Sequence, residues 1–271
     1  MSNKISTMAK RLKLATRALG AEPEKPDVAA LAEWITEHRG RMADITTYLL
    51  DRSLAPQIEA DIGMPCAGGK FYADRLLDSI DGIADLKAIC DLHADTPAII
   101  EDAAGIVVQK RKSWCALPAP HVLSIKDAYY SDADEWSDAI CGIYKTILRA
   151  MRDMGVAGHV LICDAADEFE CAALARQNVF FFQPKADRVG LEILLEHQHK
   201  VAVGNAELPV LLDLMNEYTV RHIIIVDPDQ PAIDLARSHL DPDQISVGGY
   251  FTGGDALEYW KDLVAHAECE R

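Results

Sequence analysis

Short apolar runs closed by polar turn residues recur through the second half of the chain. The clearest is Ile223–Val226, which is preceded by His222 and followed by Asp227-Pro228-Asp229. Such a run is typical of a strand that is buried on both faces. Similar runs predict six strands: His121–Ile125, His159–Cys163, Val179–Phe182, Lys200–Val203, His222–Val226 and Ile245–Val247.

Segments with apolar residues at helical spacing alternate with these runs. They predict helices at Glu135–Met154, Glu168–Arg176, Asp187–His197, Leu208–Tyr218, Ile233–Leu240 and Asp255–His266. After the long first helix, the units recur about every 20–23 residues, the length of a compact strand-and-helix unit. This alternation predicts a parallel sheet with right-handed crossovers.

The first half has a different pattern. Helices are predicted over residues 1–19, 28–50, 53–62 and 73–91, with Asp27 as an N-cap. Pro97–Ile100 and Gly105–Gln109 then resemble the two strands of a hairpin. The segment Leu117–Pro120 contains two prolines and marks the expected boundary between the two halves.

We therefore predict an α/β protein. Residues 121–271 form a Rossmann-like parallel sheet, residues 1–95 a mainly helical N-terminal or capping part, and residues 96–120 short strands and a linker. The alternative is a βα barrel, which would need Pro97–Gln109 to supply two more strands. In both folds the ligand lies at the carboxyl ends of the strands.

Polar residues follow nearly every predicted strand, which makes them candidates for a binding site. The candidates for binding a cofactor are Asp164, Gln183, Asn205, Asp227, Gly248 and Gly249. The candidates for binding a substrate are Gly68, Gly69, Lys70, Asp127, Lys185 and Thr252. Gly68-Gly69 would let the backbone approach a ligand beside the cation of Lys70, although a plain loop is the structural alternative. Thr252 opens the last helix, where an N-cap is the alternative role.

Asp227 and Asp229 flank Pro228 and should point in different directions. Pro228 biases the residue before it toward an extended conformation. We expect Asp227 to face the crevice above the sheet and Asp229 to cap the next helix. His121, His159 and His222 begin or precede predicted strands, so they should lie on the opposite rim in structural roles.

The composition of the chain excludes some classes of binding partner. The chain has 271 residues and a net charge of −16, with a pI near 4.9, so nucleic acid and acidic membranes are poor partners. No apolar run approaches the roughly 18–20 residues that span a bilayer. Seven cysteines without a CxxC pair are typical of reduced thiols in a cytoplasmic protein, and they offer no familiar zinc or iron–sulfur motif.

The motifs that are missing affect the choice of cofactor. No G-x-G-x-x-G follows a strand in the second half, which argues against NAD. The acidic strand ends suit a cation instead: a divalent metal, or the sulfonium of S-adenosylmethionine, whose ribose hydroxyls donate to carboxylates. There is no G-x-S-x-G elbow or H-E-x-x-H motif, so the pattern identifies no catalytic residue.

The helical first part, the PCAGGK stretch at Pro65–Lys70 and the glycine-poor second half resemble the HcgC-type methyltransferases. These archaeal enzymes methylate a pyridinol cofactor precursor with S-adenosylmethionine. The resemblance implies methyl transfer to a small heterocyclic acceptor in cofactor biosynthesis.

Two other functions stay open. One is a barrel lyase or hydrolase that holds Mg²⁺ or Mn²⁺ through Asp164, Asp227 and Asp229. The other is a non-catalytic ligand-binding or assembly protein. A homodimer is also expected, since Phe180–Phe182 and Tyr250-Phe251 would leave aromatic surface near strand ends.

Overall fold

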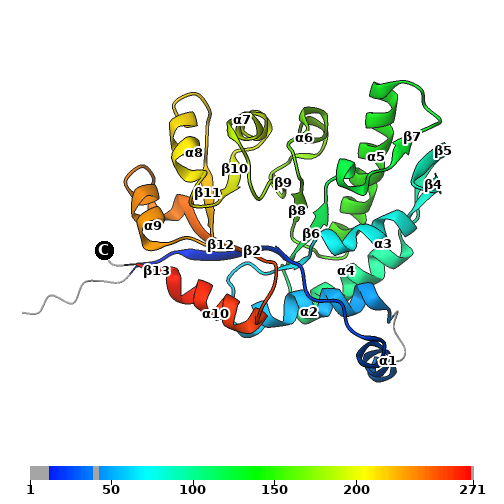
Figure 1. Ribbon diagram of the computed structural model, residues 1–271, viewed down its shortest axis with the longest axis horizontal. Helices are drawn as coiled ribbons and strands as arrows, with labels where there is room; N and C mark the ends of the chain where they lie inside the picture. Colours follow the sequence, from blue (N-terminus) through cyan, green and yellow to red (C-terminus); the bar gives the residue numbers. More distant parts are fainter. Residues whose placement is uncertain (1–11, 39–42, 270–271) are drawn as a thin grey trace, which may run out of the picture.

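A computed structural model describes residues 12–38 and 43–269. Its central feature is a set of parallel strands in two four-stranded sheets, ordered β10-β11-β12-β2 and β3-β6-β8-β9. The strands are β2 (Ala15–Ala21), β3 (Cys66–Gly68), β6 (Trp114–Pro118), β8 (His159–Ile162), β9 (Val179–Phe182), β10 (Lys200–Val203), β11 (His222–Val226) and β12 (Ile245–Phe251). They occupy the centre of the molecule (Figure 1).

The two sheets join into one closed barrel. At one seam, the Ala18 N–H donates to the Met64 carbonyl at 3.0 Å and the Met64 N–H donates to the Thr16 carbonyl at 3.0 Å, which bridges β2 to the chain entering β3. At the other seam β9 lies beside β10. The guanidinium of Arg17 in β2 lies 5.0 Å from the ring centroid of Phe180 in β9. Those strands are on opposite sides of the ring, so this contact crosses a closed interior.

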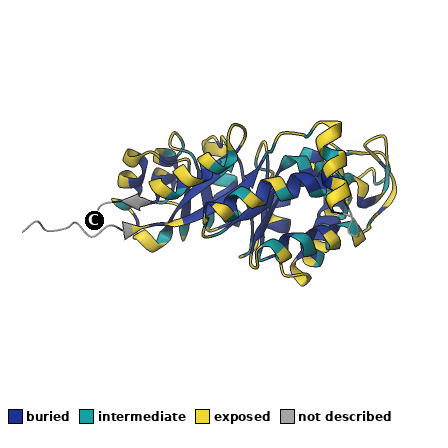
Figure 2. Cartoon of the chain, turned by 90° about the horizontal axis from the view of Figure 1, so that it is seen from below, coloured by how far each residue is buried: buried dark blue, intermediate teal, exposed yellow. Residues whose placement is uncertain are grey.

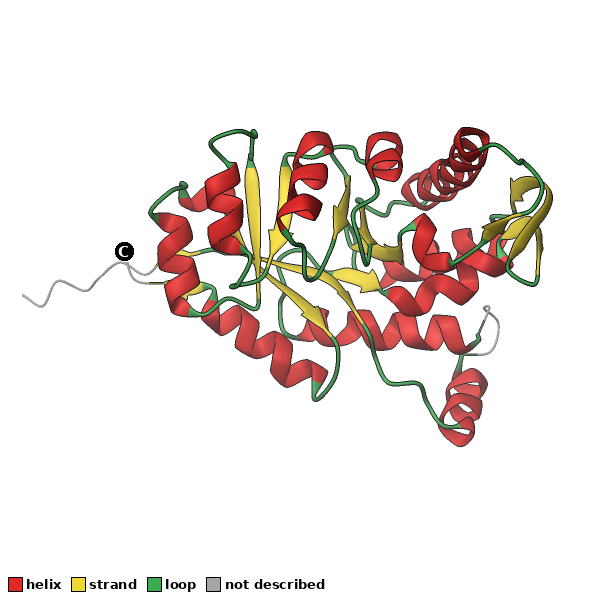
Figure 3. Ribbon diagram, turned by 45° about the horizontal axis from the view of Figure 1, so that its top comes forward, coloured by secondary structure: helices red, strands yellow, loops and turns green. Residues whose placement is uncertain are grey.

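A helix follows every barrel strand. In chain order these are α2 (Ile45–Glu59), α4 (Pro97–Gln109), α5 (Ala133–Asp153), α6 (Glu168–Leu174), α7 (Arg188–His197), α8 (Leu208–Leu214), α9 (Gln230–Arg237) and α10 (Ala256–His266). They surround the strands (Figure 3) and turn their exposed faces outward, while the strands are buried (Figure 2). None of the helices in the described residues is long and apolar enough to cross a bilayer.

Additional elements are inserted into this frame. They are α1 (Val28–Glu37), η1 (Lys70–Tyr72), α3 (Ala73–Asp78), β4 (Ile80–Ala84), β5 (Lys87–Ala94), η2 (Pro120–Leu123), β7 (Lys126–Asp127) and η3 (Pro242–Gln244). β4, β5 and β7 form a small separate sheet beside α5 (Figure 1). Two short strands, β1 (Leu12–Lys13) and β13 (Glu268–Cys269), pair antiparallel near the ends of the chain.

The predicted α/β class with parallel strands is confirmed, in the βα barrel form that was given as the alternative. The strands at 159–162, 179–182, 200–203, 222–226 and from 245 onward match the prediction, as do the helices that follow them. An open Rossmann-like sheet would leave the outer edge of β12 free, but β2 pairs with β12 in parallel over Ser246–Phe251. The strand predicted at 121–125 is wrong: β6 lies earlier, at 114–118.

The prediction that residues 1–95 are mainly helical is only partly right, because their described part contains strands β1 to β5 as well as helices α1 to α3. Of residues 1–19, the described ones form β1 and β2; residues 1–11 lie outside the described part. Helices α1 and α2 lie within the predicted 28–62 region, and Asp27 caps α1 by accepting from the Ala30 N–H at 2.8 Å. The predicted helix at 73–91 ends at Asp78, and a hairpin follows whose turn residues Asp85 and Leu86 have φ of 48° and 55°.

The segment 97–109 is one helix, and it supplies no strand. Ile99, Ala103 and Ile106 are buried at helical spacing on one face of α4, and Pro97 occupies its first turn. The linker predicted at 96–120 therefore contains a helix and a barrel strand, with β6 between β3 and β8.

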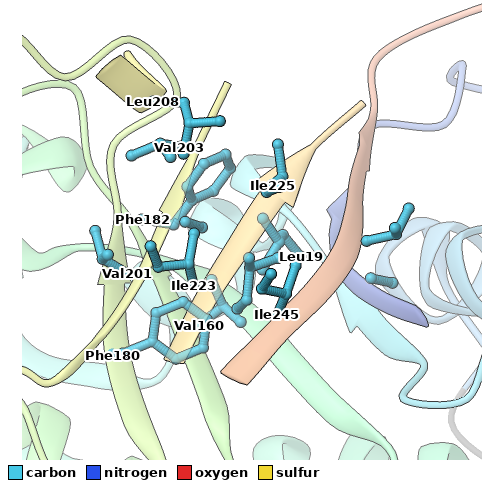
Figure 4. Packing of buried hydrophobic residues seen from close by; sticks show 14 of the residues in the cluster. Leu19, Val160, Phe180, Phe182, Val201, Val203, Leu208, Ile223, Ile225 and Ile245 are labelled. Atoms are coloured by element: carbon cyan, nitrogen blue, oxygen red, sulfur yellow. The ribbon is translucent and has the colours of Figure 1, made fainter. Parts of the chain in front are cut away.

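The barrel interior is packed with apolar side chains from many strands. Figure 4 shows Leu19, Val160, Phe180 and other members of this cluster gathered between the strands. Phe180, Phe181 and Phe182 are each at most 2% exposed, and Phe251 is 5% exposed. These rings belong to the core, so they provide no basis for the predicted dimer.

A buried ion pair ties three of the outer helices together. The Nε of Arg75 in α3 donates to Oδ2 of Asp102 in α4 at 2.8 Å, and the Tyr72 hydroxyl donates to the same oxygen at 2.7 Å. Nη2 of Arg75 donates to Oδ2 of Asp44, the N-cap of α2, at 2.7 Å. Burial raises the pKa of Asp102, and the contacts with Arg75 and Tyr72 oppose that effect.

Asp102→Ala should destabilise the protein by about 3–5 kcal/mol, because it removes one partner of a buried ion pair. The Tyr72 hydroxyl also loses its acceptor. Urea unfolding measures the free energy of unfolding. Asp153→Ala, which removes the exposed pair with Arg149, is the matched control and should cost about 0–1 kcal/mol. Equal losses for the two variants would contradict the buried role of Asp102.

Candidate functional site

The C-terminal mouth of the barrel gathers polar and charged side chains from five strand ends. We define the mouth cluster as Glu22, Lys70, His121, Asp164 and Tyr250, which follow or end β2, β3, β6, β8 and β12. Parallel strands in a barrel all end at one rim, which is where ligands of such barrels bind. The chain order of these residues shows no such proximity.

Glu22 is a carboxylate held by three donors. It accepts from the Tyr250 hydroxyl at 2.5 Å, the Lys70 N–H at 2.6 Å and the Phe71 N–H at 3.3 Å. Gly69 makes this approach possible, since a Cβ there would lie 2.3 Å from the Ala21 carbonyl oxygen. Glu22 is thus positioned by the backbone of the β3 loop and by β12.

Lys70 and Asp164 form an ion pair across the mouth. Their side chains are 36% and 67% exposed, so the pair adds little to stability, and both groups remain accessible to a ligand. Burial and the nearby Glu22 and Asp164 carboxylates raise the pKa of Tyr250, which keeps its hydroxyl a donor. Its ring packs edge-to-face on Phe182, with ring centroids 5.6 Å apart, which closes the floor of the mouth.

His121 and Glu170 form a second charged unit at the same rim. Nδ1 of His121 lies 2.9 Å from Oε2 of Glu170, and the His121 N–H donates to Oε1 at 2.7 Å. The hydrogen bond to Glu170 raises the pKa of His121 against the effect of burial, and Asp167 and Asp164 add to the rise. This pair lines a pocket of about 210 Å³ between α5 and α6, with Pro120, Ile125, Trp136, Ser137, Ile140, Cys141 and Asp167.

Sequence reasoning missed Glu22, Tyr250 and His121. The prediction that His121 lies on the opposite rim is wrong. The strand is the apolar run Trp114–Pro118, and His121 comes after it. That run was the available signal for His121. Glu22 and Tyr250 had none, since both depend on β2 pairing with β12.

The structure brings two of the predicted site residues together and places others in supporting positions. Lys70 and Asp164 meet in the mouth. Gln183 is buried, and its Oε1 accepts from the Ala166 N–H at 3.1 Å, which braces the loop after β8. Asn205 donates from Nδ2 to the Asp227 carbonyl at 3.3 Å and links the loops after β10 and β11.

The predicted glycines are required by packing. A Cβ on Gly68 would lie 2.4 Å from the Ala116 carbonyl oxygen. A Cβ on Gly248 would lie 2.3 Å from Cγ2 of Ile224, and one on Gly249 would lie 2.7 Å from the Tyr259 hydroxyl. Close contacts between neighbouring elements therefore account for Gly68, Gly248 and Gly249 without a ligand.

Three further candidates lie apart from these contacts. Asp127 belongs to β7 in the small separate sheet, where its carboxylate accepts from the N–H groups of Tyr129, Tyr130 and Ser131. Lys185 and Thr252 are exposed in the loops after β9 and β12. The N-cap of α10 is Asp255, so Thr252 does not have that role.

The roles predicted at the end of β11 are half right. Asp229 is the N-cap of α9 and accepts from the Ala232 N–H at 2.9 Å. Asp227 is not extended: its φ is 48°, and its carboxylate accepts from the Tyr259 hydroxyl of α10 at 2.5 Å. The αL conformation turns the Asp227 carboxylate toward the pocket between β11 and α10, which His266 also lines.

The proposed metal ligands Asp164, Asp227 and Asp229 do not converge. They pair with Lys70, Tyr259 and the start of α9 respectively. Among the described residues, the one group of three potential ligands close enough to hold an ion is Glu168, Glu196 and His197, and its two glutamates are exposed. The described part of the mouth therefore does not support the alternative of a metal held by these three aspartates.

Comparison with known proteins indicates the fold. No protein-family model and no curated protein matches the chain. The structure is similar to the crystal structure of a putative vitamin B12-independent methionine synthase from Listeria monocytogenes, with a TM-score of 0.64 and 13% identity. The similarity covers 94% of this chain and 96% of that chain, so it extends over the whole α/β fold.

The stability that His121 contributes should depend on pH. Its pKa is raised in the folded protein, so the stabilisation is fully present below the unfolded value of about 6.5 and is lost as pH rises through the folded value. The difference in unfolding free energy between the native chain and His121→Gln should therefore shrink from about pH 5.5 to about pH 8.5. Urea unfolding at both pH values measures it.

Glu170→Gln is the companion variant, because it removes the partner that raises the pKa of His121. In that background, His121→Gln should have a much smaller pH-dependent effect. A wild-type difference that stays constant over the whole pH range would show that His121 and Glu170 do not form the charged pair.

Proposed function

We propose that this chain is an enzyme that modifies a small polar molecule at the C-terminal mouth of its barrel, by methyl transfer to a small heterocyclic acceptor. The observation that carries the proposal is the mouth cluster. Groups of opposite charge and the Tyr250 hydroxyl, from five strand ends in all, lie at one rim, where barrel enzymes place their chemistry. The acid–base groups are the kind that such transfers require.

The choice of methyl transfer has two supports. The structural neighbour is described as a putative methionine synthase, a methyl-transfer-related enzyme. The mouth cluster also contains two carboxylates, Glu22 and Asp164, and the Lys70 cation, a combination complementary to a sulfonium methyl donor that has a carboxylate of its own. When bound, S-adenosylmethionine would supply an electrophilic methyl group.

The residues of the mouth have distinct proposed roles. Lys70 would pair with an anionic group of a ligand, leaving Asp164 to accept the proton that the acceptor loses on methylation. Glu22 is already held by three donors and would accept further hydrogen bonds from hydroxyl groups. His121 and Glu170 would orient the acceptor at the pocket between α5 and α6.

A ligand panel tests the proposal. S-adenosylmethionine, S-adenosylhomocysteine and methionine are added separately, with NAD as a comparison, and the melting temperature is measured. A ligand that binds the folded state raises the midpoint, so we expect a shift with the sulfonium donor or its product. Glu22→Gln should reduce this shift, whereas Glu24→Gln, at an exposed position two residues away, should not.

Two results would contradict the proposal. If none of the three methyl-transfer ligands shifts the midpoint, the proposed methyl donor is wrong, and a non-catalytic binding role is favoured instead. If a shift occurs but is equal in Glu22→Gln and Glu24→Gln, the ligand binds elsewhere, and the proposed location of the site in the mouth is wrong. Isothermal titration of the same variants separates a loss of affinity from a loss of stability.

A further inference from the structure

The opposite, N-terminal end of the barrel holds a group of basic side chains. We define the lower cluster as Arg17 of β2, Lys200 of β10 and His222 of β11, together with the rings of Trp114 and Phe180. Lys200 and His222 are the first residues of their strands, and Arg17 lies in the first half of β2. These basic side chains therefore lie at the end of the barrel away from the mouth cluster.

Arg17 and Lys200 share the same two aromatic rings. The Arg17 guanidinium lies 4.0 Å from the Trp114 ring centroid and 5.0 Å from that of Phe180. Nζ of Lys200 lies 5.1 Å and 5.6 Å from the same two centroids. Two side chains of like charge are thus held close together inside a protein whose net charge is −16.

Arg17 lacks the hydrogen bonds that a buried guanidinium needs. It is 2% exposed, and its Nε and Nη2 atoms are buried without a hydrogen-bond partner in the described part of the chain. The nearby Cys66 thiol does not neutralise it, because burial raises the pKa of that thiol to about 12. Cation–π contacts offset part of the desolvation, but they leave the N–H donors unsatisfied.

The surroundings also disfavour the charged forms of the other two basic side chains. Burial and then Arg17 lower the pKa of Lys200 to about 8. Burial, Lys200 and Arg17 lower the pKa of His222, while Asp243 has the opposite and smaller effect. Nε2 of His222 lies 2.8 Å from the Ser246 hydroxyl, which offers a further donor or acceptor beside it. Lys200 and His222 are only partly buried, so solvent reaches this end of the cluster.

We propose that the lower cluster is a binding site for a small tetrahedral oxyanion, of which inorganic phosphate is the probe. The planar guanidinium of Arg17 presents paired donors that match an oxyanion, and Lys200 adds a second charge. The anion would satisfy the free N–H groups of Arg17 and relieve its repulsion with Lys200. This site is at the other end of the barrel and does not depend on the proposed methyl transfer.

Isothermal titration and thermal unfolding with sodium phosphate test the site, using sodium chloride at matched ionic strength as the comparison. The wild-type chain should bind phosphate, and its melting temperature should rise above the value in chloride. Arg17→Met and Lys200→Met should each weaken phosphate binding at least about tenfold, since each removes one charged donor. Lys185→Met, at an exposed lysine in the loop after β9, should bind phosphate as the wild-type chain does.

Three outcomes would overturn the proposal. The first is a wild-type response that is the same in phosphate and chloride. The second is unchanged phosphate affinity in Lys200→Met, which decides the question even if Arg17→Met fails to fold. The third is a loss of phosphate binding in Lys70→Met with retention in Lys200→Met, which would place the anion in the mouth cluster.

Discussion

The position of β2 between β12 and β3 is the constraint on which the rest of the structure depends. Its parallel pairing with β12 and its bridge to Met64 join the two four-stranded sheets at one seam, and β9 beside β10 completes the ring at the other. Closure places Glu22 within hydrogen-bonding distance of Tyr250 and of the loop that carries Lys70. The same closure places the guanidinium of Arg17 against Phe180 on the opposite side of the barrel. Both candidate sites therefore exist only in the closed barrel.

The sequence predicts the second half well, because each strand there is a short β-branched or aromatic run that its neighbours bury on both faces. The predictions for the first half are less accurate, and the reason is again physical. Residues 15–21 are rich in alanine, which favours helix in isolation, and tertiary pairing overrides that preference. Ile106–Val108 has the composition of a strand, yet only one face of α4 is buried, at the spacing of a helix.

The candidate site divides in the same way. Asp164 follows a strand that the pattern identifies, and Lys70 follows two glycines, so both could be found from local sequence. Glu22 and Tyr250 are distant in sequence by almost the whole chain, and nothing local relates them. Asp227 shows the reverse error. It directly follows the strand that is easiest to recognise, but its backbone has a positive φ, and its carboxylate accepts a hydrogen bond from Tyr259.

The proposed function requires the C-terminal mouth to bind the small-molecule ligand. Amide NMR spectra measure this directly, because the N–H groups of Lys70 and Phe71 donate to Glu22 and report on that carboxylate. Titration with S-adenosylhomocysteine should shift the resonances of these two amides and of the amides that flank Asp164. These shifts should be the largest in the spectrum and should saturate. Saturable shifts confined to other parts of the barrel, with Lys70 and Phe71 unmoved, would contradict the account.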